Sequence, residues 1–444
     1  MNKTKSNIFK LGIPIFIQLF LFNLLNSLDT LMISSYNENL VLSINNAVSV
    51  VFMINVLLAI CSTGVGIVIS QYLGAKKQED AKIAFNNGLM FNFALSILLM
   101  IILLIFQRQL LGLIDCPEEY VKDAMTYISI TAIGIPCNGL INIFSANLRS
   151  YQKPTPITII AILSNIINVF LNYVFIFGNF SMPELGIAGA AIGTVTSQII
   201  TTIVSFVITP ILLKYKIYSF KISFFHLKKV LYIGLPSALE TFCYTLSTLF
   251  VTAAVNQLIK EEMLSRTYIN MIMTYIYQFS VAFGSANAIL VGYNVGKGEQ
   301  DTAKKETYKS FFMCYPVLLV IITILNIFGR DIMYMICKDM ESVDLILDIT
   351  SIILPWIFLY ETGRCINLIF INALKATGDV FFPLICAIIS MFLFSSLGSW
   401  VLGIYLKLGF LGVFLAQALD ECFRGVIMII RWQRDKWKTK AIIK

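Results

Sequence analysis

Charge is scarce in this sequence, and so is histidine. Only 13% of the 444 residues are charged, whereas soluble globular domains carry about 25% charged residues. His226 is the single histidine, which excludes a zinc site of the HExxH type. The nine cysteines show no paired spacing and do not predict a disulfide framework. These shortages argue against a soluble globule, against that class of zinc enzyme and against a disulfide-stapled domain.

Phosphate-binding and channel motifs are also missing. The segment GYNVGKGE, from Gly292 to Glu299, is nearest to a phosphate-binding loop, but it lacks the spacer and the Ser or Thr that should follow Lys297. Its VGYN lacks the second Gly of a potassium filter. No run of Arg at every third position indicates a voltage sensor. The sequence therefore predicts neither ATP hydrolysis by that route nor a channel.

Apolar residues are abundant instead. They make up 58% of the chain, and the mean hydropathy of +0.81 places it in a bilayer. A helix crosses the hydrocarbon with about 20 apolar residues. We therefore predict an all-α polytopic membrane protein with twelve transmembrane helices. Their expected positions are 11–34, 46–70, 85–106, 122–147, 157–178, 187–213, 230–255, 266–292, 309–329, 344–372, 381–401 and 409–431.

Lys and Arg gather in alternate connecting segments. The central segment from Lys214 to Lys229 reads KYKIYSFKISFFHLKK and contains no acidic residue. Basic residues of cytoplasmic loops orient membrane proteins. Both termini are therefore expected on the cytoplasmic side of the cell inner (plasma) membrane. The other segments predicted to be cytoplasmic hold Lys76, Lys77, Lys82, Arg149, Lys153, Lys297, Lys304, Lys305, Lys309, Lys375 and the basic residues after Ile430.

The second half of the sequence repeats the first. Gly12 and Pro14 recur as Gly234 and Pro236, and Arg149 has Lys375 as its counterpart. Gly186 and Gly189 likewise correspond to Gly409 and Gly412. Six spans return the chain to the side where it began, so the halves should form two six-helix bundles related by a pseudo-twofold axis along the membrane normal. The predicted domains are 1–213, a basic cytoplasmic linker at 214–229, and 230–444 with its basic tail.

Several motifs resemble those of the multidrug and toxic compound extrusion (MATE) family. In the first half they are LGIP with Asp29, STGVGIVISQYLGAKKQEDA, LRSYQKPTP, NIINVFLNYVFIFG and LGIAGAAIGT; in the second they are IGLPSALE, GYNVGKGEQDTAKK, LKATGDVFFP and LGFLGVFLAQALDECFRG. The resemblance covers essentially the whole chain. It implies a central cavity between the bundles and export of drugs, including organic cations, in exchange for Na+ or H+. No other cofactor is expected.

Ionisable residues inside the predicted spans of the first half are few. An ionisable side chain at mid-bilayer costs about 2.5 to 3.5 kcal/mol on insertion scales, so it needs a partner or a task. Asp29 matches the acidic residue that the resemblance assigns to ion coupling; the alternative is a carboxylate that only caps the outer helix end. Asn165, Asn168 and Asn172 share one helix face, either as a binding site or as inter-helix hydrogen bonds. In one branch of the family an Asp replaces Asn172, so this chain departs from that two-aspartate site.

The second half carries more charge. Glu240 lies near the membrane midplane with no basic residue within one helical turn, and its counterpart is Gln18. Glu361 and Arg364 should face each other. Another branch of the family has a sodium-site Asp close to Arg364, which argues against copying that site here. Asp420, Glu421 and Arg424 form a further cluster, for which structural pairing and ion coupling stay open.

The candidate site residues fall into three groups. We expect coupling through Glu240 or Glu361 ahead of the last pair of acids. The ion-coupling candidates are Asp29, Glu240, Glu361, Asp420 and Glu421. The substrate-binding candidates are Gln18, Asn165, Asn168, Asn172, Tyr244, Met273, Tyr277 and Gln278. Arg364 and Arg424 are the charge partners.

The predicted function is secondary active multidrug export with H+ or Na+ as the coupling ion. The expected partners are small organic, cationic, drug-like substrates and the lipid bilayer, without nucleic acid, and the chain is expected to be a monomer. A flippase for lipid-linked oligosaccharides would favour a strongly cationic cavity, whereas here buried acids outnumber buried Arg. A membrane enzyme is a further alternative, but this sequence contains no catalytic motif that would support it. A scaffold is the remaining alternative.

Overall fold

The computed structural model describes residues 8–36, 40–114, 116–214, 221–338 and 342–443. Within these ranges the chain forms helices and no strands. To within one residue, each predicted apolar run falls within one helix or one broken helix. Of the predicted linker 214–229, residues 215–220 lie outside the described residues. In the described part, eight helices are long and apolar enough to cross a membrane, or nine if the bent pair α4–α5 forms one span.

The helices divide into two compact units. The N-terminal unit contains residues 17–238, and the C-terminal unit contains residues 1–16 together with residues 239–444. The predicted domains 1–213 and 230–444 follow the sequence repeat, and their bounds stay a prediction. Packing divides the chain at different residues, because two helices run from one unit into the other.

These two helices are α1 (Ile8–Tyr36) and α8 (Phe224–Val255). The first turns of α1 pack in the C-terminal unit, where a side chain at Gly12 would collide with the ring of Phe283. The first turns of α8 pack in the N-terminal unit, where Gly234 lies against the backbone of Ile60. Each helix contains a proline, Pro14 or Pro236, and changes unit within three residues of it. A proline inside a helix removes one backbone hydrogen bond and favours a kink.

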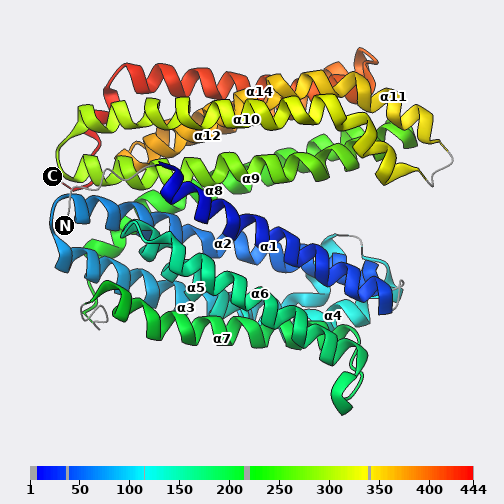
Figure 1. The fold of residues 1–444 in the computed structure, drawn as a ribbon, viewed down its shortest axis with the longest axis horizontal. Coiled ribbons are helices and arrows are strands. Elements are labelled where there is room, and N and C mark those ends of the chain that lie inside the picture. The colour runs from blue at the N-terminus through cyan, green and yellow to red at the C-terminus, as the bar shows by residue number, and fades with distance from the viewer. Residues whose placement is uncertain (1–7, 37–39, 115, 215–220, 339–341, 444) are drawn as a thin grey trace. The chain divides into compact units, whose positions relative to one another are not determined.

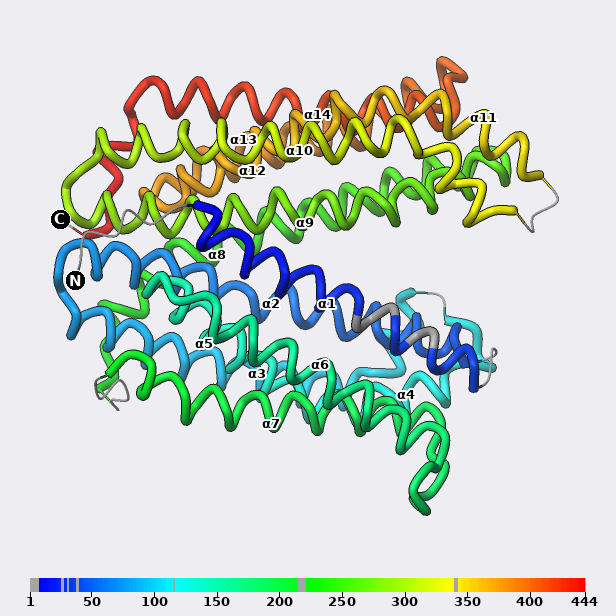
Figure 2. The backbone as a smooth tube through the Cα atoms, in the orientation of Figure 1, coloured from blue at the N-terminus to red at the C-terminus, as the bar shows by residue number. Residues whose placement is uncertain are grey.

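The N-terminal unit is built from five further long spans. They are α2 (Leu40–Gly74), α3 (Gln78–Leu113), the pair α4 (Glu118–Ala132) and α5 (Ile135–Ser150), α6 (Pro154–Phe177) and α7 (Ile187–Leu213). Helices α4 and α5 meet at a 50° bend, where Pro136 lies in the first turn of α5. Helices α2, α3 and α5 pack along one another, and α6 lies beside α7 (Figures 1 and 2).

The C-terminal unit follows the same order with more irregular helices. Its elements are α9 (Lys260–Gly296), α10 (Gln300–Cys337), α11 (Val343–Ile353), η2 (Leu354–Trp356), α12 (Ile357–Thr377), α13 (Phe381–Ser390), η3 (Met391–Leu397), η4 (Ser399–Tyr405), α14 (Gly409–Gln433) and η5 (Lys436–Thr439). Helices α12 and α14 pack side by side (Figure 1). The span that starts with α13 continues as π-helix through η3 and η4. Wide turns of this kind are rare and often occur at functional sites.

Two glycine pairs show the repeat in the backbone itself. Gly186 and Gly409 have φ of 53° and 60°, in the left-handed region that favours glycine. Three residues later, a side chain at Gly189 would collide with the backbone of α6, and a side chain at Gly412 would collide with the backbone of η4. The equivalent turn therefore opens α7 in one unit and α14 in the other.

Candidate functional site

Five charged side chains form a buried network in the C-terminal unit. Arg364 of α12 pairs with Glu361 one turn earlier (Nη1 to Oε1, 2.6 Å) and approaches Glu421 of α14 (Nε to Oε1, 3.7 Å). Arg424 pairs with Glu421 (Nη2 to Oε1, 2.9 Å) and with Asp420 (Nη2 to Oδ2, 2.8 Å). All five side chains are at most 8% exposed. Two short clusters that the sequence placed on separate helices are thus one network of three acids and two arginines.

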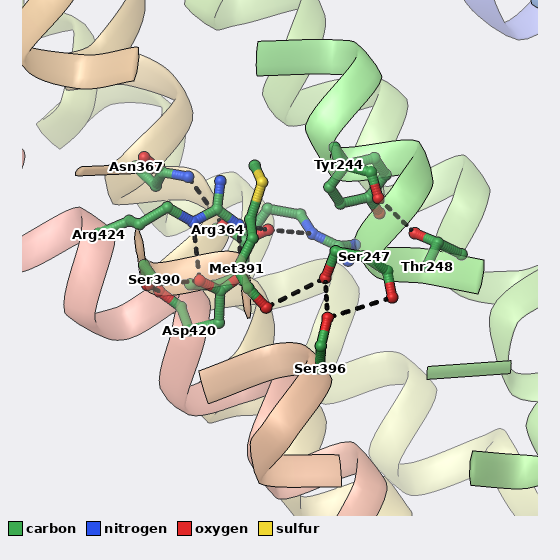
Figure 3. Close-up of polar contacts among 11 residues, drawn as sticks. Tyr244, Ser247, Thr248, Arg364, Asn367, Ser390, Met391, Ser396, Asp420 and Arg424 are labelled. Carbon is green, nitrogen blue, oxygen red and sulfur yellow. Dashed lines mark hydrogen bonds and ion pairs between the residues drawn. The ribbon is translucent and has the colours of Figure 1, made fainter. Parts of the chain in front are cut away.

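Neutral polar groups add to this network. Asn367 of α12 donates from Nδ2 to Oε2 of Glu421 at 2.9 Å. Ser390 at the end of α13 donates from Oγ to Oδ1 of Asp420 at 2.5 Å (Figure 3). Buried carboxylates need such donors, because an unsatisfied buried charge is costly. The network therefore ties α12, α13 and α14 together.

Aromatic rings cover one side of the network. The guanidinium of Arg364 lies over the ring of Tyr360 at 4.2 Å and over that of Tyr277 at 5.2 Å. An arginine held over an aromatic face gains a cation–π attraction that grows as the site is desolvated. Tyr277 comes from α9, so the network extends to a fourth helix.

A chain of hydroxyl groups joins α8 to the π-helical segment. Ser247 donates to the backbone oxygen of Met391 at 3.1 Å, and its Oγ lies 2.9 Å from that of Ser396 (Figure 3). These contacts lie beside Ser390, where α13 passes into the wide π-helical turns. The π-helix is therefore held by Ser247 on α8, and Ser390, the residue just before it, is held by Asp420 on α14.

Glu240 has a basic partner, contrary to our expectation. Lys375 of α12 lies 2.9 Å from it (Nζ to Oε2), and both side chains are at most 13% exposed. The expectation considered only the neighbours of Glu240 along its own helix. Lys375 was assigned to a cytoplasmic connection, but it lies in the last turn of α12 with its charge turned inward. The burial of Glu240 is thus explained by an ion pair between two helices.

The N-terminal unit places Asp29 beside one of the predicted asparagines. Asn172 of α6 donates from Nδ2 to Oδ1 of Asp29 at 2.6 Å. Asn168, one turn earlier, donates to Thr194 of α7 at 3.2 Å, and Asn165 donates to the backbone oxygen of Leu21 at 3.1 Å. Within the described ranges no basic side chain pairs with Asp29. The asparagine face therefore joins α1, α6 and α7 and leaves the carboxylate with an amide partner.

A second polar pair in this unit involves Gln18. Arg149 of α5 donates from Nη2 to Oε1 of Gln18 at 2.5 Å. Arg149 was expected in a cytoplasmic connection, yet it is partly buried within the last turns of its helix. Among the residues that the structure describes, it has no acidic partner. Gln18 is consequently a partner for a partly buried guanidinium.

The remaining substrate-binding candidates differ in how far their side chains are exposed. Tyr244 and Tyr277 are 44% and 37% exposed, and Gln278 is partly buried. Met273 is only 2% exposed, so it packs inside its unit and faces no open space in this structure. In the described part of the chain, no group of His, Cys, Asp or Glu side chains could hold a metal ion. The polar sites consist of carboxylates, amides and basic groups.

The family model described as MatE matches residues 14–174 and residues 236–401 of this chain. The second match begins at Pro236, the repeat counterpart of Pro14. The chain belongs to the MatE family. This MatE chain is therefore a multi-pass membrane transporter and not an enzyme, as predicted.

Relatives of this MatE transporter cover nearly its full length. The uncharacterized transporter YisQ of Bacillus subtilis is 29% identical, with 99% of this chain and 96% of YisQ covered. The probable multidrug resistance protein NorM of Thermotoga maritima is 24% identical, with coverage of 99% and 94%.

Solved structures share the fold. A MOP superfamily transporter from Pyrococcus furiosus has a TM-score of 0.88 at 18% identity, with 98% of this chain and 96% of that chain covered. An outward-facing multidrug resistance MATE family transporter has a TM-score of 0.87, also at 18% identity, with coverage of 97% and 96%. The predicted all-α fold with twelve helices in two bundles is confirmed.

Several polar side chains that contact the candidate residues of this MatE transporter were not predicted from the sequence. Asn367 and Ser390 were not singled out, because uncharged residues in a membrane helix are common. Arg149 and Lys375 were noted only as loop charges. The repeat contained a signal for Arg149 and Lys375. Gln18 is equivalent to Glu240, and Arg149 is equivalent to Lys375, so the two polar pairs occupy the same positions in the two halves.

Proposed function

We propose that this transporter exports small, cationic, drug-like organic compounds across the plasma membrane in exchange for H+ or Na+, by alternating access. Relatives of this chain are named probable multidrug resistance proteins, which supports drug-like substrates. Repeated bundles with polar sites inside them are the usual architecture of secondary transporters. Both termini are cytoplasmic in this proposal.

We assign ion coupling to Asp29. The supporting observation is its hydrogen bond from Asn172, at 2.6 Å, with no ion pair to Asp29 among the residues that the structure describes. A coupling carboxylate must release and regain a cation in every cycle, and a permanent arginine or lysine partner would compete with that cation. Glu240, Glu361, Asp420 and Glu421 each have such a partner. They are therefore weaker candidates than Asp29.

Purified protein in vesicles would test this function. With a fluorescent organic cation inside the vesicles, an imposed pH or Na+ gradient should drive its transport in the wild type. Asp29→Asn should lower the gradient-driven rate at least about tenfold, equivalent to about 1.4 kcal/mol. Binding of the dye and the melting temperature should stay unchanged, since Asn has the same volume and can still accept a hydrogen bond from Asn172.

Asp331→Asn is the matched control, because Asp331 is exposed on α10. It removes the same charge and should transport normally. Normal gradient-driven transport by Asp29→Asn would remove Asp29 from the mechanism. Failure of the wild type to move any organic cation under either gradient would contradict multidrug export itself and favour the flippase alternative.

A further inference from the structure

A pocket lies at the end of α14 in the C-terminal unit, away from the buried network. It has a volume of about 150 Å³ and is lined by three apolar and three basic residues. The apolar residues are Phe382, Ile427 and Ile430, and the basic residues are Arg431, Arg434 and Lys436. They come from the start of α13, the last turns of α14 and the turn that follows it.

The apolar wall continues into a surface suited to hydrocarbon. Ile430 is 42% exposed, and its neighbours Val426 on α14 and Phe381 and Ile385 on α13 are at least half exposed. The span Phe381–Tyr405 is long and apolar enough to cross a membrane. An acyl chain lying along this wall would bury the same apolar groups that the bilayer covers.

The basic residues differ in how far their charge is neutralised. Arg431 pairs with Asp379 (Nε to Oδ2, 2.8 Å) and lies over the ring of Phe382 at 4.5 Å. Arg434 and Lys436 are exposed, and neither pairs with an acid in the described part of the chain. Two positive charges are therefore available at the rim of an apolar wall.

The segment that carries Lys436 is fixed in place. Asp435 has a left-handed φ of 56° that turns the chain, and Lys304 of α10 holds its carboxylate at 2.7 Å. Trp437 is buried and stacks on Trp432 with ring centroids 4.1 Å apart. Its Nε1 donates to the backbone oxygen of Trp432 at 2.9 Å. Lys436 thus lies between two anchored residues, so little backbone freedom is lost when its side chain binds an anion.

We propose that this pocket binds an anionic phospholipid of the surrounding leaflet. Arg434 and Lys436 contact its phosphate, with Arg431 behind them, and an acyl chain lies against Phe382, Ile427 and Ile430. Basic pockets between helices at a cytoplasmic membrane surface are a known mode of anionic lipid binding. A zwitterionic lipid would bring a second positive charge to the same rim and would bind less well.

Thermal unfolding of the detergent-solubilised full-length protein would test this site. Dioleoyl phosphatidylglycerol should raise the melting temperature of the wild type, because a ligand that binds only the folded state stabilises it. Dioleoyl phosphatidylcholine and glycerol 3-phosphate should give a much smaller shift. Arg434→Gln with Lys436→Gln should lose most of the phosphatidylglycerol shift, while its melting temperature without lipid stays near that of the wild type.

Lys260→Gln with Lys407→Gln is the matched control. Both lysines are exposed in the same unit, outside the pocket, and their loss changes the net charge equally. This control should keep the full shift. Native mass spectrometry should show fewer bound phosphatidylglycerol molecules on the pocket variant only. An unchanged shift in the pocket variant, an equal shift with phosphatidylcholine, or an equal shift with glycerol 3-phosphate would overturn the proposal.

Discussion

The two units place polar pairs at equivalent positions but build them from different chemistry. In the N-terminal unit, Arg149 donates to the neutral amide of Gln18. In the C-terminal unit, Lys375 pairs with the carboxylate of Glu240 at 2.9 Å. The repeat has kept a basic residue just after the fourth predicted span of the first half and just after the corresponding tenth span, while the partner of that residue has changed from amide to acid.

The same contrast extends to the other buried charges. Asp29 is bonded to Asn172, whereas the acids of α12 and α14 share two arginines. Charges with an opposite partner can stabilise the folded protein without further function. A charge that is bonded to an amide is harder to explain by stability alone. The number of buried charges in a unit therefore does not identify the unit that couples transport to an ion.

The largest expected effect comes from breaking the network of the C-terminal unit. Arg424→Gln leaves Asp420 and Glu421 without their shared cation and should destabilise the protein by about 3–5 kcal/mol. Thermal unfolding in detergent would measure this. The double variant Arg424→Gln with Asp420→Asn removes one charge of each sign and should recover most of the stability. If the single variant were as stable as the wild type, the network would not hold α12 and α14 together.

A smaller loss of stability is expected when the Glu240–Lys375 pair is changed to resemble the Gln18–Arg149 pair. Glu240→Gln leaves Lys375 with an amide and should cost about 1.5–3 kcal/mol, the range for hydrogen bonds to charged groups. Gradient-driven transport should keep the same dependence on pH and Na+ as the wild type. A changed ion dependence would return Glu240 to the coupling mechanism and weaken the assignment to Asp29. Glu240→Gln with Lys375→Gln is the control that removes the unpaired charge.

The smallest effect should come from the reverse exchange. Gln18→Glu gives Arg149 a carboxylate and should stabilise the protein by about 1 kcal/mol, since a charge-assisted hydrogen bond replaces one to a neutral amide. A modest rise in melting temperature would show it. Gln18→Leu, which removes the acceptor, should lower the melting temperature instead. A fall with Gln18→Glu would mean that the two positions are not equivalent.

Contacts between side chains of the same helix could be predicted from the sequence. The spacing of Glu361 and Arg364, and of Asp420 and Arg424, predicted their pairing because residues three or four apart share a helix face. The apolar runs also predicted the spans, since the length needed to cross hydrocarbon is fixed. Positions of charges in the last turns of helices were predicted less well, as Lys375 shows, because hydropathy alone does not say which way such a side chain turns.

Contacts between helices could not be predicted in the same way. The bonds of Asn172 to Asp29 and of Asn367 to Glu421 depend on the rotation and axial register of two helices. Neither quantity is encoded in the spacing along one helix. The π-helical turns of η3 and η4 also escaped prediction, because their sequence reads as an ordinary apolar span.

The exchange of α1 and α8 between the units bears on how the protein can be divided. If the chain is cut between α7 and α8, each fragment keeps the opening turns of a helix that belong to the other unit, namely residues 8–16 and 224–238. Neither fragment alone contains all the segments of its own bundle. The two fragments should therefore reconstitute a transporter only when they are produced together, with each one completing the fold of the other.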